Sequence, residues 1–204
     1  MQLDQGEKGF SFQKEGPLDM RMDPTGQLTA EEIVNRWDVK ELGAIFRDLG
    51  EEPRWRRAAD AIVRERRQNP IMTTKHLADL MASALGSRTR GKLHPATLIF
   101  QGLRICVNRE LDVLKEGLSK ALELLTPGGR MGVISFHRLE DRIVKEVFRT
   151  AAAPLKRSRG DTQRQSPLFR LLTKKPLAPQ FAEMRANSRS RSAKMRFIEK
   201  LEQI

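Results

Sequence analysis

Residues 127–150 read PGGRMGVISFHRLEDRIVKEVFRT, and this stretch decides the fold class. The opening Pro-Gly-Gly is a turn that ends the preceding element. The apolar run 131–136 is short and bounded by turn signals, which predicts a buried strand. Apolar residues then recur at helical spacing over about 139–150, which predicts a helix. A strand that lies between helices indicates an α/β protein.

A helical block precedes this stretch. Thr29 is a good N-cap and Glu32 follows three residues later, so a capping box is expected. Helical spacing of apolar residues then predicts further helices. Their expected ranges are about 38–48, 54–68, 73–85 and 95–125, the last with a break. Residues 1–26 are rich in Gly and Pro and are expected to form a loop, but their apolar side chains suit a loop that packs on the protein.

The C-terminal part is expected to contribute two more strands. Residues 151–166 are rich in Pro, Lys, Arg, Ser and Gln and are expected to be a mobile connection. Short β-like runs follow at 168–172 and 193–199, separated by a basic loop at 187–192. A strand between helices followed by two strands is typical of the second half of an α/β sheet.

The charge indicates a polyanionic partner. The 204 residues carry a formal net charge of +12, with an isoelectric point near 10.4. Nucleic acid is the commonest partner of so basic a domain, and a solvated basic surface is the alternative. Basic faces at 54–67, 87–92 and 185–196 would contact phosphates without reading sequence. Because the chain has no Tyr and only 5% aromatic residues, a multi-base stacking platform is not expected.

Cysteine and histidine usage argues against disulfides and metal sites. Cys106 is the only cysteine, and its apolar helical surroundings favour a buried, inert thiol. His76, His94 and His137 have no ligand spacing, so no metal site is expected. No apolar run is long enough to span a bilayer, and the first residues do not resemble a signal peptide. A cytoplasmic location is therefore expected.

Three long motifs carry a family resemblance. The first spans 8–23 and contains KGFSF and GPLDMRMD, the second is HPAT, FQGLRI and VNREL over 94–111, and the third is PGGR and ISFHRLEDRIVK over 127–145. Shorter matches are Gly-Glu-Glu at 50–52 and the ending at 187–196. Together they resemble the RsmH (MraW) methyltransferase family over essentially the whole chain.

The resemblance implies the C-terminal part of a class I Rossmann-like methyltransferase sheet with an inserted all-helical substrate domain. Residues 1–26 would be the loop after strand four, 27–92 the helical substrate-binding insert, and 93–204 the C-terminal half of the Rossmann-like catalytic domain. The implied reaction is S-adenosylmethionine-dependent N4-methylation of a cytosine in 16S ribosomal RNA, near the decoding centre of the small ribosomal subunit. The motifs do not distinguish a monomer from a homodimer.

Several family features are absent. The family's Gly-Gly-His loop, its acid after strand two and its Asp-Leu-Gly-Val-Ser-Ser segment have no counterpart here, while Leu98 replaces Arg and Arg138 replaces Ser. A glycine-rich turn such as the Gly-Gly-His loop lets the backbone approach a nucleotide-like ligand. Because the chain lacks it, the chain alone is expected to bind S-adenosylmethionine weakly or not at all. A methyltransferase lacking its N-terminal part is the favoured hypothesis. A non-catalytic RNA-binding or ribosome-associated protein and a non-functional remnant are the alternatives.

The resemblance also implies the site residues. Asp19, Asp23 and His137 are the catalytic candidates, because a cytosine amine needs hydrogen-bond acceptors as it attacks. Gln2 is the cofactor candidate. The RNA candidates are Arg21, His94, Arg104, Asn108, Ser135 and Arg142.

Structural roles are open for several of these residues. Asp19, Arg21 and Asp23 could instead form an ion-paired loop. His137 could satisfy a local hydrogen bond, and a cap-like role is favoured for His94 before Pro95. Arg104 and Asn108 share a helix face and could contact RNA or bridge to the loop acids.

Overall fold

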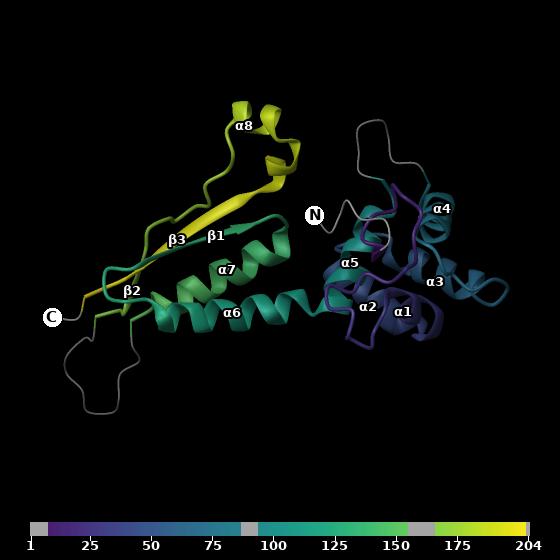
Figure 1. The fold of residues 1–204 in the computed structure, drawn as a ribbon, viewed down its shortest axis with the longest axis horizontal. Helices are drawn as coiled ribbons and strands as arrows, with labels where there is room; N and C mark the ends of the chain where they lie inside the picture. Colours follow the sequence, from purple (N-terminus) through teal and green to yellow (C-terminus); the bar gives the residue numbers. More distant parts are fainter. Residues whose placement is uncertain (1–7, 87–93, 155–165, 203–204) are drawn as a thin grey trace. The chain divides into compact units, whose positions relative to one another are not determined.

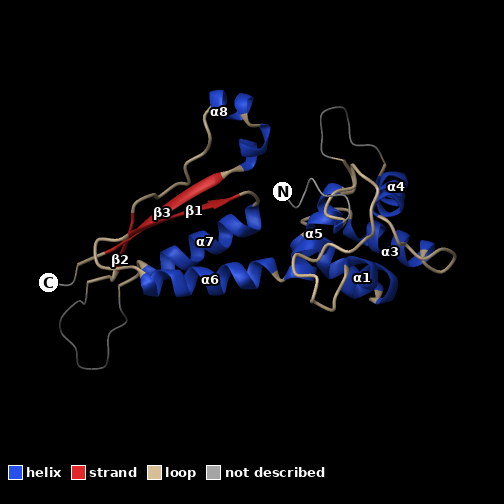
Figure 2. Cartoon of the chain, in the orientation of Figure 1, coloured by secondary structure: helices blue, strands red, loops and turns tan. Residues whose placement is uncertain are grey.

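The computed structural model describes residues 8–86, 94–154 and 166–202 and divides the chain into two compact units. One is the helical unit, residues 1–110, and the other is the sheet unit, residues 111–204 (Figures 1 and 2). Helices and a three-stranded sheet are both present, so the α/β prediction is confirmed at this level. The described chain has no helix that is long and apolar enough to span a membrane.

Capping residues begin the helices of the helical unit. Thr29 accepts the Glu32 amide and Thr73 accepts the His76 amide. Asp38 and Glu41 form a full capping box. The predicted box at Thr29 is only half formed, because the Glu32 carboxylate pairs with Arg36 at 3.4 Å. The elements are α1 (Ala30–Arg36), α2 (Val39–Ala44), the π-helix η3 (Ile45–Leu49), α3 (Trp55–Glu65), α4 (Thr74–Leu85) and α5 (Thr97–Asn108).

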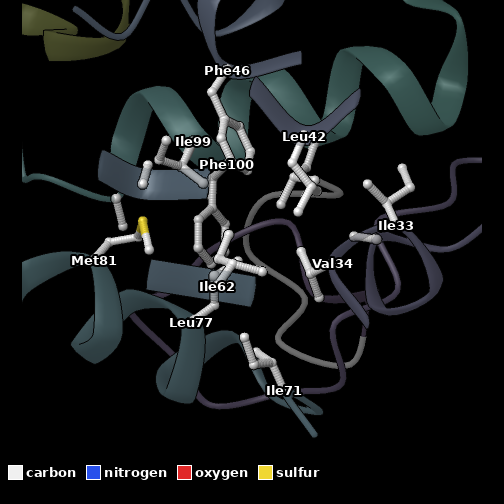
Figure 3. Close-up of a cluster of buried hydrophobic side chains, with 14 of the residues drawn as sticks. Ile33, Val34, Leu42, Phe46, Ile62, Ile71, Leu77, Met81, Ile99 and Phe100 are labelled. Atoms are coloured by element: carbon white, nitrogen blue, oxygen red, sulfur yellow. The ribbon is translucent and has the colours of Figure 1, made fainter. Parts of the chain in front are cut away.

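The apolar faces of these helices meet in one core (Figure 3). Ile33, Leu42, Phe46 and Ile62 are fully buried there. The labelled side chains come from α1, α2, η3, α3, α4, α5 and, with Ile71, from the segment between α3 and α4. Burial of so many aliphatic groups is the main term that stabilises the unit.

The N-terminal loop belongs to this core, as its apolar residues predicted. Phe10, Leu18 and Met20 are buried in the cluster. The backbone of Leu18 donates to Met72 O at 3.0 Å, and Pro17 forms an isolated bridge with Thr73. The loop is therefore held at both its side chains and its backbone.

Two glycines let η3 approach α5 closely. A Cβ on Gly50 would lie 2.5 Å from the carbonyl oxygen of Leu98, and one on Gly102 would lie 3.1 Å from Gly50 N. Gln101 donates to the carbonyl of Leu49 at 3.2 Å across the same contact. The Gly-Glu-Glu and Phe-Gln-Gly motifs thus face each other, and their glycines leave room for the two backbones.

The predicted break in the long helix lies at Arg109, whose φ of 49° ends α5. The next helix, α6, spans Glu110–Leu124. Left-handed backbone cannot continue a right-handed helix, so α5 and α6 are separate elements. Both halves of the prediction are confirmed.

The sheet unit contains the three predicted strands. They are β1 (Arg130–Ser135), β2 (Phe169–Leu171) and β3 (Lys194–Lys200). The order is β1-β3-β2, with β3 antiparallel to both neighbours, and Met131 lies opposite Ile198. Helix α7 (Arg138–Ala151) follows β1 as predicted. Residues 155–165, within the expected mobile connection, lie outside the described residues.

Two short helices were not predicted. They are α8 (Phe181–Ala186) and the 3₁₀ helix η4 (Ser188–Ser192), where a basic loop was expected at 187–192. Asn187 begins η4 by accepting the amide of Arg189 at 3.1 Å. Such a short element has no apolar periodicity that sequence reasoning could detect.

The prediction that 131–136 is a buried strand was wrong about burial. Ile134 is 53% exposed and Phe136, just beyond β1, is 52% exposed. Within the described chain, β1 pairs only with β3, and α7 contacts one side of the sheet (Figure 1). An apolar run indicates where a strand forms but not how many layers cover it.

Buried charge joins α7 to β3. Asp141 accepts two bonds from Arg196, at 2.7 and 3.1 Å, and both residues are buried. The hydrogen bonds from Arg196 lower the pKa of the Asp141 carboxyl. Glu199 likewise pairs with Arg130 and Arg170, and their hydrogen bonds lower its pKa.

The boundary between the compact units follows Glu110, whereas the boundary inferred from the family resemblance lies at 92/93. The reason is that α5 packs on η3 and α1, inside the helical core. The division into loop, insert and catalytic half concerns roles in the family and stays a prediction.

Candidate functional site

The candidate site in the helical unit begins with an ion pair inside the N-terminal loop. Arg21 donates to both carboxylate oxygens of Asp19, at 2.8 and 2.7 Å, and its backbone amide adds a bond of 3.0 Å. The same guanidinium donates to the carbonyls of Pro24 and Gly26. The hydrogen bond from Arg21 lowers the pKa of Asp19. Of the two roles considered, this geometry fits the ion-paired loop.

Asp23 lies in the same loop but is held differently. Its Oδ1 accepts from the amide and the hydroxyl of Thr25, at 2.9 and 2.7 Å. These bonds lower the pKa of Asp23, so its carboxylate is charged at neutral pH. The side chain is exposed, and Oδ2 retains its capacity to accept.

Asn108 fixes the backbone between the two acids. Its side chain accepts from Met22 N at 2.7 Å and donates to Met20 O at 2.8 Å. Met20 has a φ of 64°, a left-handed conformation that is uncommon outside glycine. The amide thus holds a strained loop in place, and it bonds backbone groups rather than Asp19 or Asp23.

The other two candidates of this unit also have local partners. Arg104 makes a two-pronged ion pair with Glu110, at 2.8 and 3.0 Å. His94 accepts the Ala96 amide at 3.2 Å, in agreement with a cap-like role. Its ring stacks on Phe12 with centroids 4.6 Å apart, which attaches the N-terminal loop to the start of α5.

A second group of candidates lies in the sheet unit, where β1 leads into α7. Ser135 is buried at the end of β1, and its hydroxyl donates to Lys194 O at 3.4 Å. His137 is the N-cap of α7 and its Nδ1 accepts the Glu140 amide at 3.3 Å. Glu140 completes a capping box by accepting the amides of Phe136 and His137.

The cap determines the tautomer of His137. An Nδ1 that accepts a hydrogen bond carries no proton in the neutral ring, so the proton lies on Nε2. Glu140 Oε1 is 3.3 Å from that nitrogen. The predicted local hydrogen bond of His137 is therefore present. Glu140 was not among the predicted site residues, and its spacing of three residues after the N-cap is the available signal of a capping box.

Two predicted site residues remain, the RNA candidate Arg142 and the cofactor candidate Gln2. Arg142 lies on the exposed side of α7. Gln2 lies outside the described residues. Asp19, Arg21, Asp23, Arg104, Asn108 and His94 gather in the helical unit, whereas Ser135, His137 and Arg142 gather in the sheet unit.

A hollow of about 620 Å³ lies elsewhere in the sheet unit, between α6, α7 and β2. Leu122, Val147 and Phe169 are among its lining residues, and none of the predicted site residues lines it. Its position separates it from the end of β1, where open α/β folds contact their ligands.

Comparison with known proteins identifies a family over nearly the whole chain. The sequence profile described as the MraW methylase family matches residues 1–201. Three relatives carry the name ribosomal RNA small subunit methyltransferase H. They come from Protochlamydia amoebophila, Thermomicrobium roseum and Syntrophotalea carbinolica, and are 53%, 50% and 48% identical to this chain over 98% of its length. The chain spans less than two thirds of these relatives, 65%, 62% and 65% respectively.

Proposed function

Because this chain belongs to the MraW methylase family, we propose that it forms part of an enzyme that transfers a methyl group from S-adenosylmethionine to N4 of a cytosine in 16S ribosomal RNA near the decoding centre. The observation that carries the proposal is the family match over residues 1–201. The names of the relatives support the class of substrate, small-subunit ribosomal RNA.

The chemistry sets clear demands on the protein. The lone pair of an exocyclic cytosine amine is delocalised into the ring, so the amine is a weak nucleophile. A protein promotes attack by aligning the amine with the methyl donor and by accepting a hydrogen bond from its N–H. The base must also leave its stack. An acceptor on an exposed, anchored loop would meet the demand for a hydrogen bond from the N–H.

Asp23 fits the role of amine acceptor better than Asp19. Arg21 already makes three bonds to the Asp19 carboxylate, whereas the two bonds to Asp23 both go to Oδ1. Asp23 is also the more exposed of the two acids. We therefore assign hydrogen-bond acceptance to Asp23, and maintenance of the loop to Asp19 and Arg21.

The sheet unit supports a larger Rossmann-like sheet. The second edge of β1 has no partner strand among the described residues, and its apolar residue Ile134 is 53% exposed. Open edges and uncovered apolar surface are usually paired or covered in a finished fold. We propose that strands other than the three described here pair with this edge, and that residues 27–92 are the helical substrate-binding insert.

The residues described here do not fit a complete cofactor site. S-adenosylmethionine sites of this fold class use a glycine-rich turn after a strand. The strand-to-helix turn after β1 is Phe136-His137, and a capping box occupies its amides. No reaction step is therefore assigned to a cofactor contact in this part of the chain.

The test is methyl transfer by the protein isolated from its source. Small-subunit ribosomal RNA is incubated with the protein and isotopically labelled S-adenosylmethionine, then digested, and the nucleosides are identified by mass spectrometry. We expect labelled N4-methylcytidine. A label on C5 or on a ribose hydroxyl would overturn the N4 assignment.

A second candidate function is RNA binding without catalysis. The net charge of +12 and the lack of a glycine-rich turn in the described residues favour it. The same experiment separates the two, because a non-catalytic protein would retain RNA and transfer no label.

A further inference from the structure

The outer side of α7 carries a line of cations. Arg138, Arg142, Lys145 and Arg149 are all exposed, and they are separated by four, three and four residues. Residues at this spacing lie on one helix face. The opposite face buries Val144 and Phe148 in the core of the sheet unit, so the cations face solvent. We call these four residues the α7 basic stripe.

A hollow lies beside the C-terminal half of this stripe. Its volume is about 160 Å³. Lys145 and Arg149 line it from α7, and Lys174 lines it from the segment that follows β2. Phe148 and Leu171 supply apolar lining. Besides Arg196, which is paired with Asp141, the hollow is thus lined by two cations of α7 and one of the segment after β2.

These three cations are not paired with acids. Among residues 8–86, 94–154 and 166–202, no acidic side chain makes an ion pair with Lys145, Arg149 or Lys174. The neighbouring acid Asp141 is already bound to Arg196. Like charges that gather without counter-charges repel one another, and a bound anion removes that cost.

The geometry favours a chain of anions over a single small ligand. The hollow of about 160 Å³ is smaller than the roughly 300–1,000 Å³ of typical small-molecule pockets. It has room for a phosphoryl group. Neighbouring cations of the stripe are spaced about 4.5–6 Å apart along the helix axis, a distance comparable to that between successive phosphates of one nucleic-acid strand.

We propose that the α7 basic stripe and Lys174 bind the sugar-phosphate backbone of a single RNA strand, with one phosphate seated in the hollow. The inference rests on the proposed function, for which it names an RNA contact beyond the target base. Lysine and arginine bind phosphates without reading bases, so this surface would hold the strand in register and contribute no sequence preference.

The test compares two charge-matched variants of the full chain. In K145Q/R149Q two stripe cations are removed from α7, and in K115Q/K120Q two exposed cations are removed from α6. Binding of a fluorescein-labelled oligouridylate is measured by anisotropy over a range of salt concentrations. Circular dichroism checks that both variants retain the helix content of the parent.

We expect K145Q/R149Q to bind about tenfold more weakly and to flatten the plot of log K against log salt by roughly 1.4 units. K115Q/K120Q should leave affinity and slope near the parent values. K174Q alone should reduce the slope by about 0.7 units if its ammonium contacts a phosphate. Equal losses in both double variants would show diffuse attraction and overturn the assignment.

Other outcomes separate this inference from the proposed function. If K145Q/R149Q binds RNA as tightly as the parent does, the stripe does not bind the RNA backbone, whether or not N4-methylcytidine forms. If RNA binding falls as expected but the source protein yields no N4-methylcytidine, the RNA-binding role of the stripe is supported and the proposed reaction is wrong. If K145Q/R149Q binds phosphatidylglycerol vesicles more weakly than the parent but binds RNA equally well, the stripe binds a lipid surface and the proposal is overturned.

Discussion

At the scale of single residues, the candidate site depends on side chains that form hydrogen bonds with the backbone of the N-terminal loop. Asn108 bonds the backbone of Met20 and Met22 from 86 and more residues away in the sequence. Met20 remains in a left-handed conformation although its side chain is fully buried. Such strain persists only where the surroundings over-determine the conformation.

Asn108→Ala should release this loop. The substitution removes the bonds to Met20 and Met22 and the bond to Arg104 O, so we expect the free energy of unfolding to fall by about 2 kcal/mol. Urea denaturation measures the change. Asn69→Ala is the control, because Asn69 is exposed and its replacement should change stability by less than about 0.5 kcal/mol. An equal response of both variants would contradict the anchoring role.

Asp23→Asn should impair methyl transfer more than folding. The amide retains an oxygen for Thr25 but loses the charged acceptor, and we expect the turnover of the source protein to fall on the order of a hundredfold. Initial rates with labelled methyl donor give the effect. Asp48→Asn, which breaks an exposed pair with Arg47, is the charge-matched control. Unchanged turnover in the Asp23 variant would remove Asp23 from the reaction.

At the scale of elements, close contacts between backbones explain two of the sequence motifs. The glycines of Gly-Glu-Glu and Phe-Gln-Gly face each other across η3 and α5. The buried pair of Asp141 and Arg196 joins α7 to β3 in the other unit. Disrupting each contact is expected to change the free energy of unfolding in a different way.

Gly50→Ala should destabilise the helical unit. The new methyl group would lie 2.5 Å from the carbonyl of Leu98 and 2.8 Å from that of Phe46, and both atoms are backbone. We expect a loss of about 2 kcal/mol from the backbone shifts that the clash requires. Gly117→Ala provides a control of opposite sign. Nothing lies within 4 Å of its Cβ position in α6, so alanine should stabilise by about 1 kcal/mol.

Asp141→Asn should lower stability at neutral pH and lose its effect in acid. The pKa of Asp141 is below its ordinary value of 3.8 in the folded protein. Its contribution is therefore fully present above that value and disappears as pH falls through the lowered folded pKa. At pH 7 the variant leaves Arg196 buried without an anion, which should cost roughly 3 kcal/mol.

Chemical denaturation at several pH values tests this dependence. The difference between parent and variant should shrink once the pH falls below 3.8. Asp141→Leu combined with Arg196→Met removes both charges and should recover most of the loss, because an apolar pair leaves no buried ion. A difference that stays constant with pH would exclude the ion pair as its source.

At the scale of the whole molecule, the cofactor is the main question. The described residues offer acceptors, cations and an open strand edge, but no glycine-rich turn after a strand. The chain spans less than two thirds of the relatives with which it shares about half its residues.

The 204-residue chain alone should bind S-adenosylmethionine weakly or not at all. Among the described residues, the amides of the turn after β1 are already bound by Glu140, so this turn does not offer them to a nucleotide-like ligand. Titration calorimetry should show no saturable heat at micromolar concentrations. Micromolar affinity would mean that the described residues contain a cofactor site of another kind.

Local patterns predicted most elements because they act over a few residues. Thr29 and Thr73 start helices through bonds to amides three positions away. Apolar runs placed β1, β2 and β3 within about two residues. The half-formed box at Thr29 shows the limit, since Glu32 found a competing partner in Arg36.

The sequence by itself determined the helices other than α8 and η4, the strands, the basic character and, through its motifs, the family. Only the tertiary structure decided what the candidate residues contact, because Asn108 bonds Met20 O through packing and not through sequence spacing. It also decided that one edge of β1 has no partner strand among the described residues. Periodicity reports which side of an element is apolar, whereas the partner of that side depends on how distant elements pack.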